Sequence, residues 1–222
     1  WAPAWPSRDA ITLTPSEAGA LTEPSEAPGD RRMNVRLISH VNRDDDLIEA
    51  WLQHYLRLGV DSFHLIVHGG REQNQRLFEI ADRYPVQILD TYTGAFDPYE
   101  KRDRLAWGLA TLRGGWIVLV DSDEFLELPY RSLSATINMM RWLRADTLRA
   151  PMLQRFAWDG IYIDGGARPF DAYPWCSVDL YAQLGQPQAV IEKYPIFELR
   201  RKTWLKSGGN HYPPNGYGSP LG

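Results

Sequence analysis

The chain has 222 residues, of which 44% are hydrophobic, and a formal net charge of -4. This length and apolar content are enough for one sizeable core, and the acidic balance argues against nucleic acid as a partner. The single cysteine excludes an internal disulfide framework and is compatible with a reducing compartment, so we expect a cytoplasmic protein. No apolar run approaches the ~18 residues of a membrane-spanning helix, and we therefore expect no transmembrane segment.

The chain divides by composition into two parts. Residues 1–32 are rich in Pro, Ala, Ser and Glu and show no periodic apolar pattern. This composition is typical of an arm or linker. We therefore predict an N-terminal arm over 1–32 and a single folded domain over 33–222.

Strands and helices alternate in the first part of the predicted domain. Gly59 is a natural stop for the first helix, whose expected N-cap is Asp46, and Pro85 ends the second. The predicted order is strand 35–41, helix 46–58, strand 63–67, helix 77–84, strand 86–89, helix 98–112 and strand 116–120. The continuous apolar run of the last strand is typical of a parallel strand covered on both faces. The pattern predicts an α/β fold with a mostly parallel central sheet flanked by helices.

The pattern is looser after residue 127. We expect one further helix over 133–143, strands over 149–156 and 199–205, and a loop or tail over 207–222.

The segment WIVLVDSDEFLELP carries the clearest chemical signal. Its apolar strand ends in Asp121, Asp123 and Glu124, and ligands of open α/β sheets bind at the carboxyl ends of strands. In regular strand geometry Asp121 and Asp123 would face the same side, where two carboxylates repel unless a cation lies between them. Oxygen ligands of this kind select Mn²⁺ or Mg²⁺ and leave positions for phosphate oxygens. The alternative is that these acids cap the next turn and lie in water.

Two segments together resemble a known family. VDSDEF after an apolar strand is similar to the D-x-D-E-F motif of family-2-like glycosyltransferases with the GT-A fold. RLISHVNRDDDLIEAWLQHYLRLGVDSFHLI resembles the opening of that family, a strand followed by an E-W-L-x-H-Y helix and a second strand. The resemblance implies a single GT-A-type, Rossmann-like domain that binds a nucleotide-sugar donor, with a divalent metal on the diphosphate.

The resemblance also assigns the metal site. It implies that Asp123 is a direct metal ligand and that Asp121 contacts the ribose or shares the ion. Glu124 would fix the loop. Family members often carry a late histidine that completes the metal site, and His211 stands at that place, although it is equally well an ordinary tail histidine.

Further residues are candidates for contacts with the donor. Asn42 and Arg43 follow the first strand, whereas Lys101 and Arg102 open the third helix. Lys202 is a later candidate for the diphosphate, because cations near phosphate form charge-assisted hydrogen bonds. The family usually has a carboxylate after the second strand for the base and ribose, and this chain has His68 and two glycines there instead.

An inverting transferase needs a carboxylate that takes the proton of the acceptor hydroxyl. We prefer Asp159, which follows Trp158 in a segment similar to the loop below the acceptor sugar of related enzymes; Asp164 and Glu192 are alternatives. His54 and Tyr55 have apolar helical spacing, and we expect structural roles for both.

The resulting hypothesis is a metal-dependent glycosyltransferase that moves a sugar from a nucleotide-sugar donor to a hydroxyl of a saccharide or another acceptor. One alternative is a GT-A-like module that binds a nucleotide or sugar without turnover. Another is a D-x-D phosphatase, in which the motif sits on the first strand of the domain and continues to Thr or Val. Here the motif follows about the fourth strand and continues to Glu124 and Phe125.

Overall fold

The computed structural model describes residues 33–42, 47–156, 169–177, 185, 192–200 and 203–214. The chain divides into two compact units, Trp1–Arg32 and Met33–Gly222, and all the described residues belong to the second. The arm expected over 1–32 lies outside the described residues and stays a prediction.

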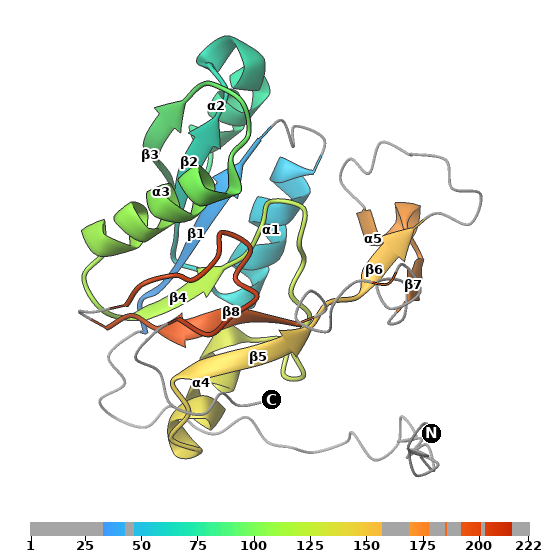
Figure 1. Cartoon of the computed structure of the whole chain (residues 1–222). Helices are drawn as coiled ribbons and strands as arrows, with labels where there is room; N and C mark the ends of the chain where they lie inside the picture. The colour runs from blue at the N-terminus through green and yellow to red at the C-terminus, as the bar shows by residue number, and fades with distance from the viewer. Residues whose placement is uncertain are drawn as a thin grey trace. The chain divides into compact units, whose positions relative to one another are not determined.

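The described part of the chain contains alternating strands and helices (Figure 1). They are β1 Val35–Val41, α1 Ile48–Leu58, β2 Ser62–His68, the 3₁₀ helix η1 Arg71–Asn74, α2 Gln75–Ala81, β3 Val86–Tyr92, α3 Pro98–Thr111, β4 Trp116–Leu119, α4 Leu133–Trp142, β5 Thr147–Pro151, β6 Gln154–Phe156, α5 Pro169–Ala172, β7 Trp175–Ser177 and β8 Glu192–Glu198. No helix among the described residues is long and apolar enough to cross a membrane.

The central sheet has six strands in the order β3-β2-β1-β4-β8-β5 (Figure 1). The first four are mutually parallel, whereas β8 runs antiparallel to both β4 and β5. Strands β6 and β7 form a separate antiparallel pair. The order and connections confirm the predicted fold class, an α/β, Rossmann-like domain with a mostly parallel central sheet flanked by helices.

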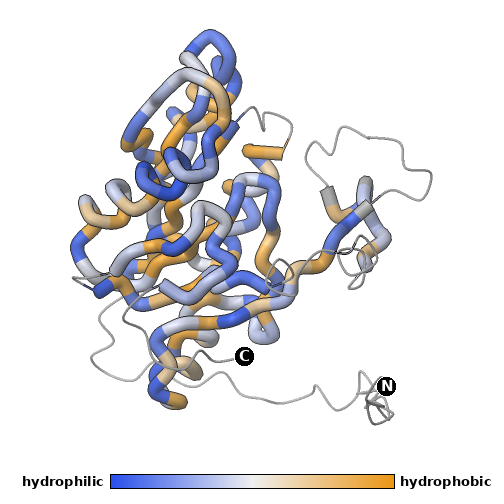
Figure 2. Tube along the Cα trace, viewed as in Figure 1, coloured by the Kyte–Doolittle hydropathy of each residue, from blue (hydrophilic) through white to orange (hydrophobic). Residues whose placement is uncertain are grey.

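Apolar side chains cover both faces of the sheet. Leu37 packs in a core with α1, α2 and α4, and its neighbour Ile38 points to the opposite face and packs with α3. Both side chains are fully buried. Figure 2 shows the corresponding hydrophobic colour along the central strands. Burial on both faces explains why β4 is a continuous apolar run in the sequence.

The last strand was predicted in the wrong place. We expected a strand over 199–205, but the described residues of that range form none, and the strand is β8, which ends at Glu198. Lys193 and Pro195 lie within β8 and interrupt its apolar pattern. The single strand expected over 149–156 is in fact β5 and β6, two strands of different sheets.

Other element ends follow local chemistry. Gly59 ends α1 with a φ of 103°, a left-handed conformation that glycine adopts without strain. The Asp97 side chain accepts a hydrogen bond from the Tyr99 amide and caps α3, and Pro98 occupies the first turn. The N-cap expected at Asp46 lies outside the described residues, and Leu47 precedes α1 without a side-chain cap.

Close packing of α3 on the sheet depends on Gly108. A Cβ at this position would lie 2.8 Å from the Ile38 Cδ1 atom and 3.3 Å from the Ile66 Cδ1 atom. Both isoleucines are fully buried, so their methyl groups have little space into which to move.

We expect Gly108→Val to lower the free energy of unfolding by about 1–3 kcal/mol, because the new side chain overpacks this contact. Ala110→Val is the matched control, since Ala110 is exposed on the same helix and this change costs only helix propensity, well under ~1 kcal/mol. Urea denaturation measures both variants. Equal losses of stability would show that α3 tolerates a side chain at the sheet contact.

Candidate functional site

The acidic segment after β4 forms a turn rather than a continuation of the strand. β4 ends at Leu119, and the Glu124 amide donates a hydrogen bond to the Asp121 carbonyl at 3.1 Å. The Glu124 carboxylate in turn accepts a hydrogen bond from the Asp121 amide at 3.1 Å. Strand alternation therefore does not govern Asp121 and Asp123, contrary to our expectation. Asp121 is partly buried, whereas Asp123 is exposed.

Three side chains of α1 hold this turn from one side. The Trp51 indole N–H donates to the Asp121 carbonyl at 3.2 Å, and the His54 Nε2–H donates to the Leu126 carbonyl at 2.9 Å. The Tyr55 hydroxyl donates to the Glu124 carbonyl and accepts from the Leu126 amide, both at 3.0 Å. Trp51 and Tyr55 are fully buried, so these hydrogen bonds fix the turn to the core. His54 and Tyr55 thus have structural contacts, as expected.

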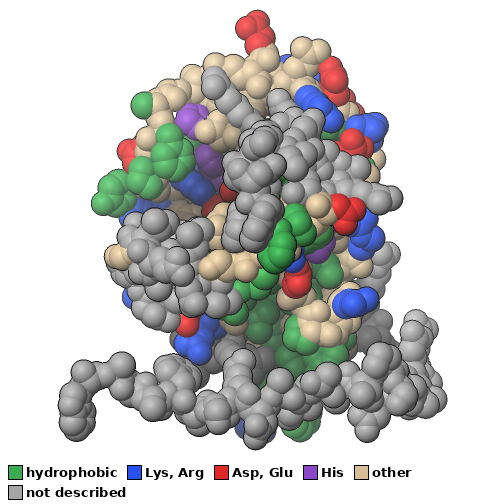
Figure 3. All heavy atoms as spheres, turned by 90° about the vertical axis from the view of Figure 1, so that its right-hand side faces the viewer, with side chains coloured by type: hydrophobic (Ala, Val, Ile, Leu, Met, Phe, Trp, Pro, Cys, Tyr) green, Lys and Arg blue, Asp and Glu red, His purple; other side chains and the backbone are tan. Residues whose placement is uncertain are grey.

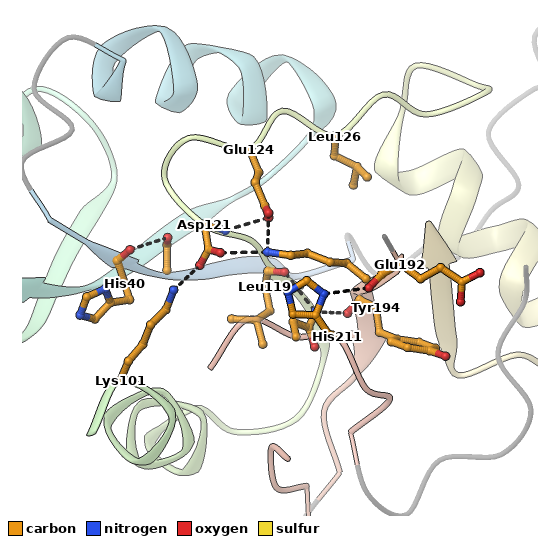
Figure 4. A network of polar contacts seen from close by, with 12 residues as sticks. His40, Lys101, Leu119, Asp121, Glu124, Leu126, Glu192, Tyr194 and His211 are labelled. Atoms are coloured by element: carbon orange, nitrogen blue, oxygen red, sulfur yellow. Dashed lines mark hydrogen bonds and ion pairs between the residues drawn. The ribbon is translucent and has the colours of Figure 1, made fainter. Parts of the chain in front are cut away.

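Two lysines hold the Asp121 carboxylate from the other side (Figure 4). The Lys101 ammonium of α3 donates to Asp121 Oδ1 at 2.7 Å, and the Lys193 ammonium of β8 donates to Asp121 Oδ2 at 2.9 Å. Lys193 also forms an ion pair with Glu124. We call Asp121, Glu124, Lys101 and Lys193 the carboxylate–lysine cluster. It joins three elements that are far apart in the sequence.

Burial and charge set the ionisation of this cluster. Burial opposes ionisation of Asp121, but the charges and hydrogen bonds of Lys193 and Lys101 outweigh it and lower the pKa of this carboxyl. Burial and the nearby charge of Asp121 raise the pKa of Glu124 to about 7. Crowding by protein atoms and the charge of Asp121 also raise the pKa of Asp123, although that residue keeps solvent access. Asp121 is therefore the carboxylate that the lysines stabilise in its charged form.

These contacts bear on the predicted metal ligands. Both oxygens of Asp121 accept hydrogen bonds from ammonium groups, which compete with a metal ion for this carboxylate, and its role as a metal ligand stays a prediction. Among the described residues there is no group of three or more His, Cys, Asp and Glu side chains that could hold a metal ion. The Asp123 carboxylate and the His211 imidazole are side-chain groups that can bind Mn²⁺ or Mg²⁺. The ion itself stays a prediction.

The tail places His211 beside the cluster. Asn210 is buried, and its side chain donates to the Leu119 carbonyl at the end of β4 at 3.3 Å, while its carbonyl accepts from the Tyr194 amide at 3.0 Å. The His211 Nδ1–H donates to the Glu192 carbonyl at 3.1 Å, which leaves Nε2 as the unprotonated nitrogen. Burial lowers the pKa of His211, so the ring is neutral at pH 7.

The structure places the other predicted site residues in three different ways. Lys101 reaches the cluster, whereas Arg102 pairs with Asp103 on its own helix and lies over the Tyr99 ring. Asn42 is exposed and directly follows β1, at the same edge of the sheet as Asp121. Three predicted residues lie outside the described residues: Arg43, Asp159 and Lys202.

A group of rings lies at the carboxyl ends of β1, β2 and β3. We call His40, His68, Tyr92 and Phe96 the ring group. The His68 and Tyr92 rings stack with their centroids 4.7 Å apart, and the His40 Nε2 atom lies 2.8 Å from the Tyr92 hydroxyl. His40, His68 and Tyr92 are buried, whereas Phe96 is 56% exposed and gives the group its accessible apolar surface. Figure 3 shows histidine side chains next to basic and acidic ones in a hollow of the surface.

The ring group adjoins the carboxylate–lysine cluster. Burial, and after it the charges of Lys101 and His68, lower the pKa of His40 to about 4, and the charge of Asp121 opposes this shift. The His68 Nε2–H donates to the Gly94 carbonyl at 3.0 Å, and its buried Nδ1 atom has no hydrogen-bond partner among the described residues.

Sequence reasoning missed Lys193 and the ring group. Lys193 lies in a segment that showed no apolar alternation, and the signal available was a lysine just before the apolar residues Tyr194 to Phe197. His40 and His68 had a clearer signal, since each is a polar residue at the end of an apolar strand.

Comparisons with known proteins give distant similarity in structure only. No protein-family model matches the chain, and no curated protein matches it significantly. S. aureus TarS in complex with UDP-GlcNAc has a TM-score of 0.38 and 13% identity over 52% of this chain and 33% of that one. The 4-diphosphocytidyl-2C-methyl-D-erythritol synthase of Anaerococcus prevotii has a TM-score of 0.36 and 13% identity over 75% and 70% of the two chains.

A third similar structure is CMP:2-keto-3-deoxy-manno-octonic acid synthetase with CTP, which has a TM-score of 0.37 and 13% identity over 56% of this chain and 54% of that one. The chain spans only 21% to 38% of the TarS chains that it matches. These scores are low, so the function has to come from the site itself.

The low pKa of His40 predicts a pH dependence of stability. Its folded-state pKa, about 4, lies below the ordinary value of 6.5, so the unfolded chain binds the proton first and stability falls as the pH drops from 6.5 to 4. His40→Gln removes the titrating ring. Below pH 6.5 the wild type should lose up to about 3 kcal/mol more than this variant.

Urea denaturation of both proteins at several pH values between 4.5 and 8 measures this difference. The two stability curves should run parallel above pH 7 and diverge below it. Parallel curves over the whole range would show that His40 is not held neutral by the fold.

Proposed function

We propose that the protein is a glycosyltransferase that moves a sugar from a nucleotide-sugar donor to the hydroxyl group of an acceptor. One observation carries the proposal: a group of aromatic rings, of which His68 and Tyr92 stack, and a lysine-bearing cluster lie next to each other at the carboxyl ends of β1 to β4. A nucleoside diphosphate needs this combination, because its base stacks on rings and its phosphates bind ammonium groups. The edge of the sheet is where open α/β folds bind such ligands.

In the reaction, the acceptor oxygen forms a bond to the anomeric carbon as the bond from that carbon to the phosphate oxygen breaks. The nucleoside diphosphate leaves with the electrons of that bond. Lys101 and Lys193 supply positive charge and hydrogen bonds at the strand end where this anion develops. The acceptor hydroxyl loses its proton to a carboxylate, for which Asp159 is our candidate.

Asp123 and the Nε2 atom of His211 are the proposed holders of a divalent metal ion. The supporting observations are the solvent access of Asp123 and the tautomer of His211 that its hydrogen bond to Glu192 sets. When bound, Mn²⁺ or Mg²⁺ would neutralise charge on the leaving diphosphate.

The contacts of Asp121 argue against the phosphatase alternative. In that reaction the first aspartate of the motif is the nucleophile, so one of its oxygens must be free to attack. Here both oxygens are hydrogen-bonded to lysines, and the motif follows the fourth strand of the domain. A binding module without turnover would use the same residues and is distinguished by activity alone.

Thermal unfolding with UDP, GDP, CDP and ADP and with their common sugar conjugates tests the proposal. A ligand present at ~100 times its dissociation constant stabilises the folded state by about 2.7 kcal/mol, which is readily measured. We expect one nucleotide series to raise the unfolding temperature, and slow release of free sugar from its conjugate. Binding without sugar release would indicate the binding module, and no binding in any series would contradict both functions.

Asp123→Ala tests the proposed metal ligand. We expect this variant to lose the part of nucleoside diphosphate affinity that depends on Mn²⁺, while its unfolding temperature without ligand stays within a few degrees of the wild type. Calorimetric titration with and without Mn²⁺ measures the two affinities. Asp82→Ala is the matched control, because Asp82 is an exposed carboxylate in the turn after α2. An unchanged Mn²⁺ effect in Asp123→Ala would remove Asp123 from the metal site.

A further inference from the structure

Lys193 is a charged residue in the interior of the sheet. It is only 5% exposed, and it lies on β8, between β4 and β5. A buried ammonium group is costly unless it is paired and hydrogen-bonded. Lys193 meets this condition through Asp121 and Glu124, whose charges outweigh the effect of burial and raise its pKa. The fold therefore keeps a permanent positive charge at the carboxyl end of β4.

Neither lysine is saturated by these contacts. An ammonium group has three N–H donors. Among the described residues, Lys193 donates to one oxygen of Asp121 and one of Glu124, and Lys101 donates to the other oxygen of Asp121. As far as the described part of the chain shows, one donor of Lys193 and two of Lys101 are left for a ligand or water.

Asp121 holds the two ammonium groups close together. Each approaches a different oxygen of one carboxylate, within 2.9 Å, so both lie at the same strand end although like charges repel. The tail also supports Lys101, because a Cβ at Gly208 would lie 3.1 Å from the Lys101 Cγ atom and 3.2 Å from the Arg102 amide nitrogen. Glycine at position 208 thus lets the tail pack against the stem of Lys101.

We propose that Lys101 and Lys193 are the groups that bind the donor's phosphates, and that Asp121 is a positioning residue that holds them rather than a metal ligand. This inference rests on the proposed function. Asp121 and Glu124 offset most of the charge of the two lysines. The contribution of the cluster is therefore a pair of directed, charge-assisted hydrogen bonds, and it is compatible with a divalent ion at Asp123.

Calorimetric titration of Lys101→Met, Lys193→Met and Asp121→Asn tests the inference. The probes are inorganic pyrophosphate and UDP, GDP, CDP and ADP, each in EDTA and in Mn²⁺. All three variants should bind the diphosphate probes at least about tenfold more weakly, in EDTA as well as in Mn²⁺, since each loses or misplaces a charge-assisted hydrogen bond. Affinity for the corresponding nucleoside, which has no phosphate, should stay unchanged.

The control variant is Arg141→Met, which removes a positive charge from the exposed last turn of α4 and should keep wild-type affinity. Lys193→Met leaves Glu124 without its ion-pair partner and Asp121 with Lys101 alone, so the double variant Lys193→Met/Glu124→Gln replaces it if the single variant unfolds. Lys101 has a side chain 13% exposed and gives an independent result.

The outcomes separate this inference from the proposed function. If the wild type binds a nucleoside diphosphate and both lysine variants keep full affinity, the inference is wrong and the proposed function stands. If Asp121→Asn loses affinity only in Mn²⁺ while the lysine variants keep theirs, Asp121 is a metal ligand after all. A wild type that binds none of the probes overturns the proposed function, and the inference with it.

Discussion

The ion pairs of Asp121 with Lys101 and Lys193 bring together the end of β4, the first turn of α3 and the strand β8. Removing one partner from such a buried pair leaves an uncompensated charge, at a cost of about 3–5 kcal/mol. That cost limits where these elements can lie. The antiparallel β8 must stay beside β4 for Lys193 to reach Asp121, and the start of α3 must stay at the carboxyl edge of the sheet. The charges at the site therefore also help to specify the fold.

The two segments that carry the sequence resemblance meet at this point. Trp51 and Tyr55 belong to the segment that resembles the family opening, and they bond to the backbone of Asp121 and Glu124 in the acidic motif. These α1 side chains support the site indirectly, because they fix the turn that presents the carboxylates. This contact explains why the two segments together are more informative than either one alone.

The sequence predicted the fold well up to β4 because strands and helices alternate with clear stop signals such as Gly59, and because burial of β4 on both faces produces an unbroken apolar run. It failed at β8, where the site required a buried lysine in a strand and Pro195 removed a further apolar signal. The acidic turn was found because three carboxylates after an apolar strand are unusual. The sequence also indicated a cation near Asp121, but the periodicity of single elements cannot show that a lysine of a distant strand pairs with it.

The state of His40 completes the electrostatics of this edge. A charged imidazolium here would add a third positive group beside Lys101 and would repel it. Burial keeps the pKa of His40 at about 4, so the ring is neutral at pH 7 and can accept or donate one hydrogen bond with Tyr92. His40 thus stays uncharged next to a cluster in which carboxylates offset most of the charge of the lysines. Aromatic rings beside directed ammonium groups suit a ligand with an uncharged aromatic end and an anionic end, because the rings can contact the first and the ammonium groups the second.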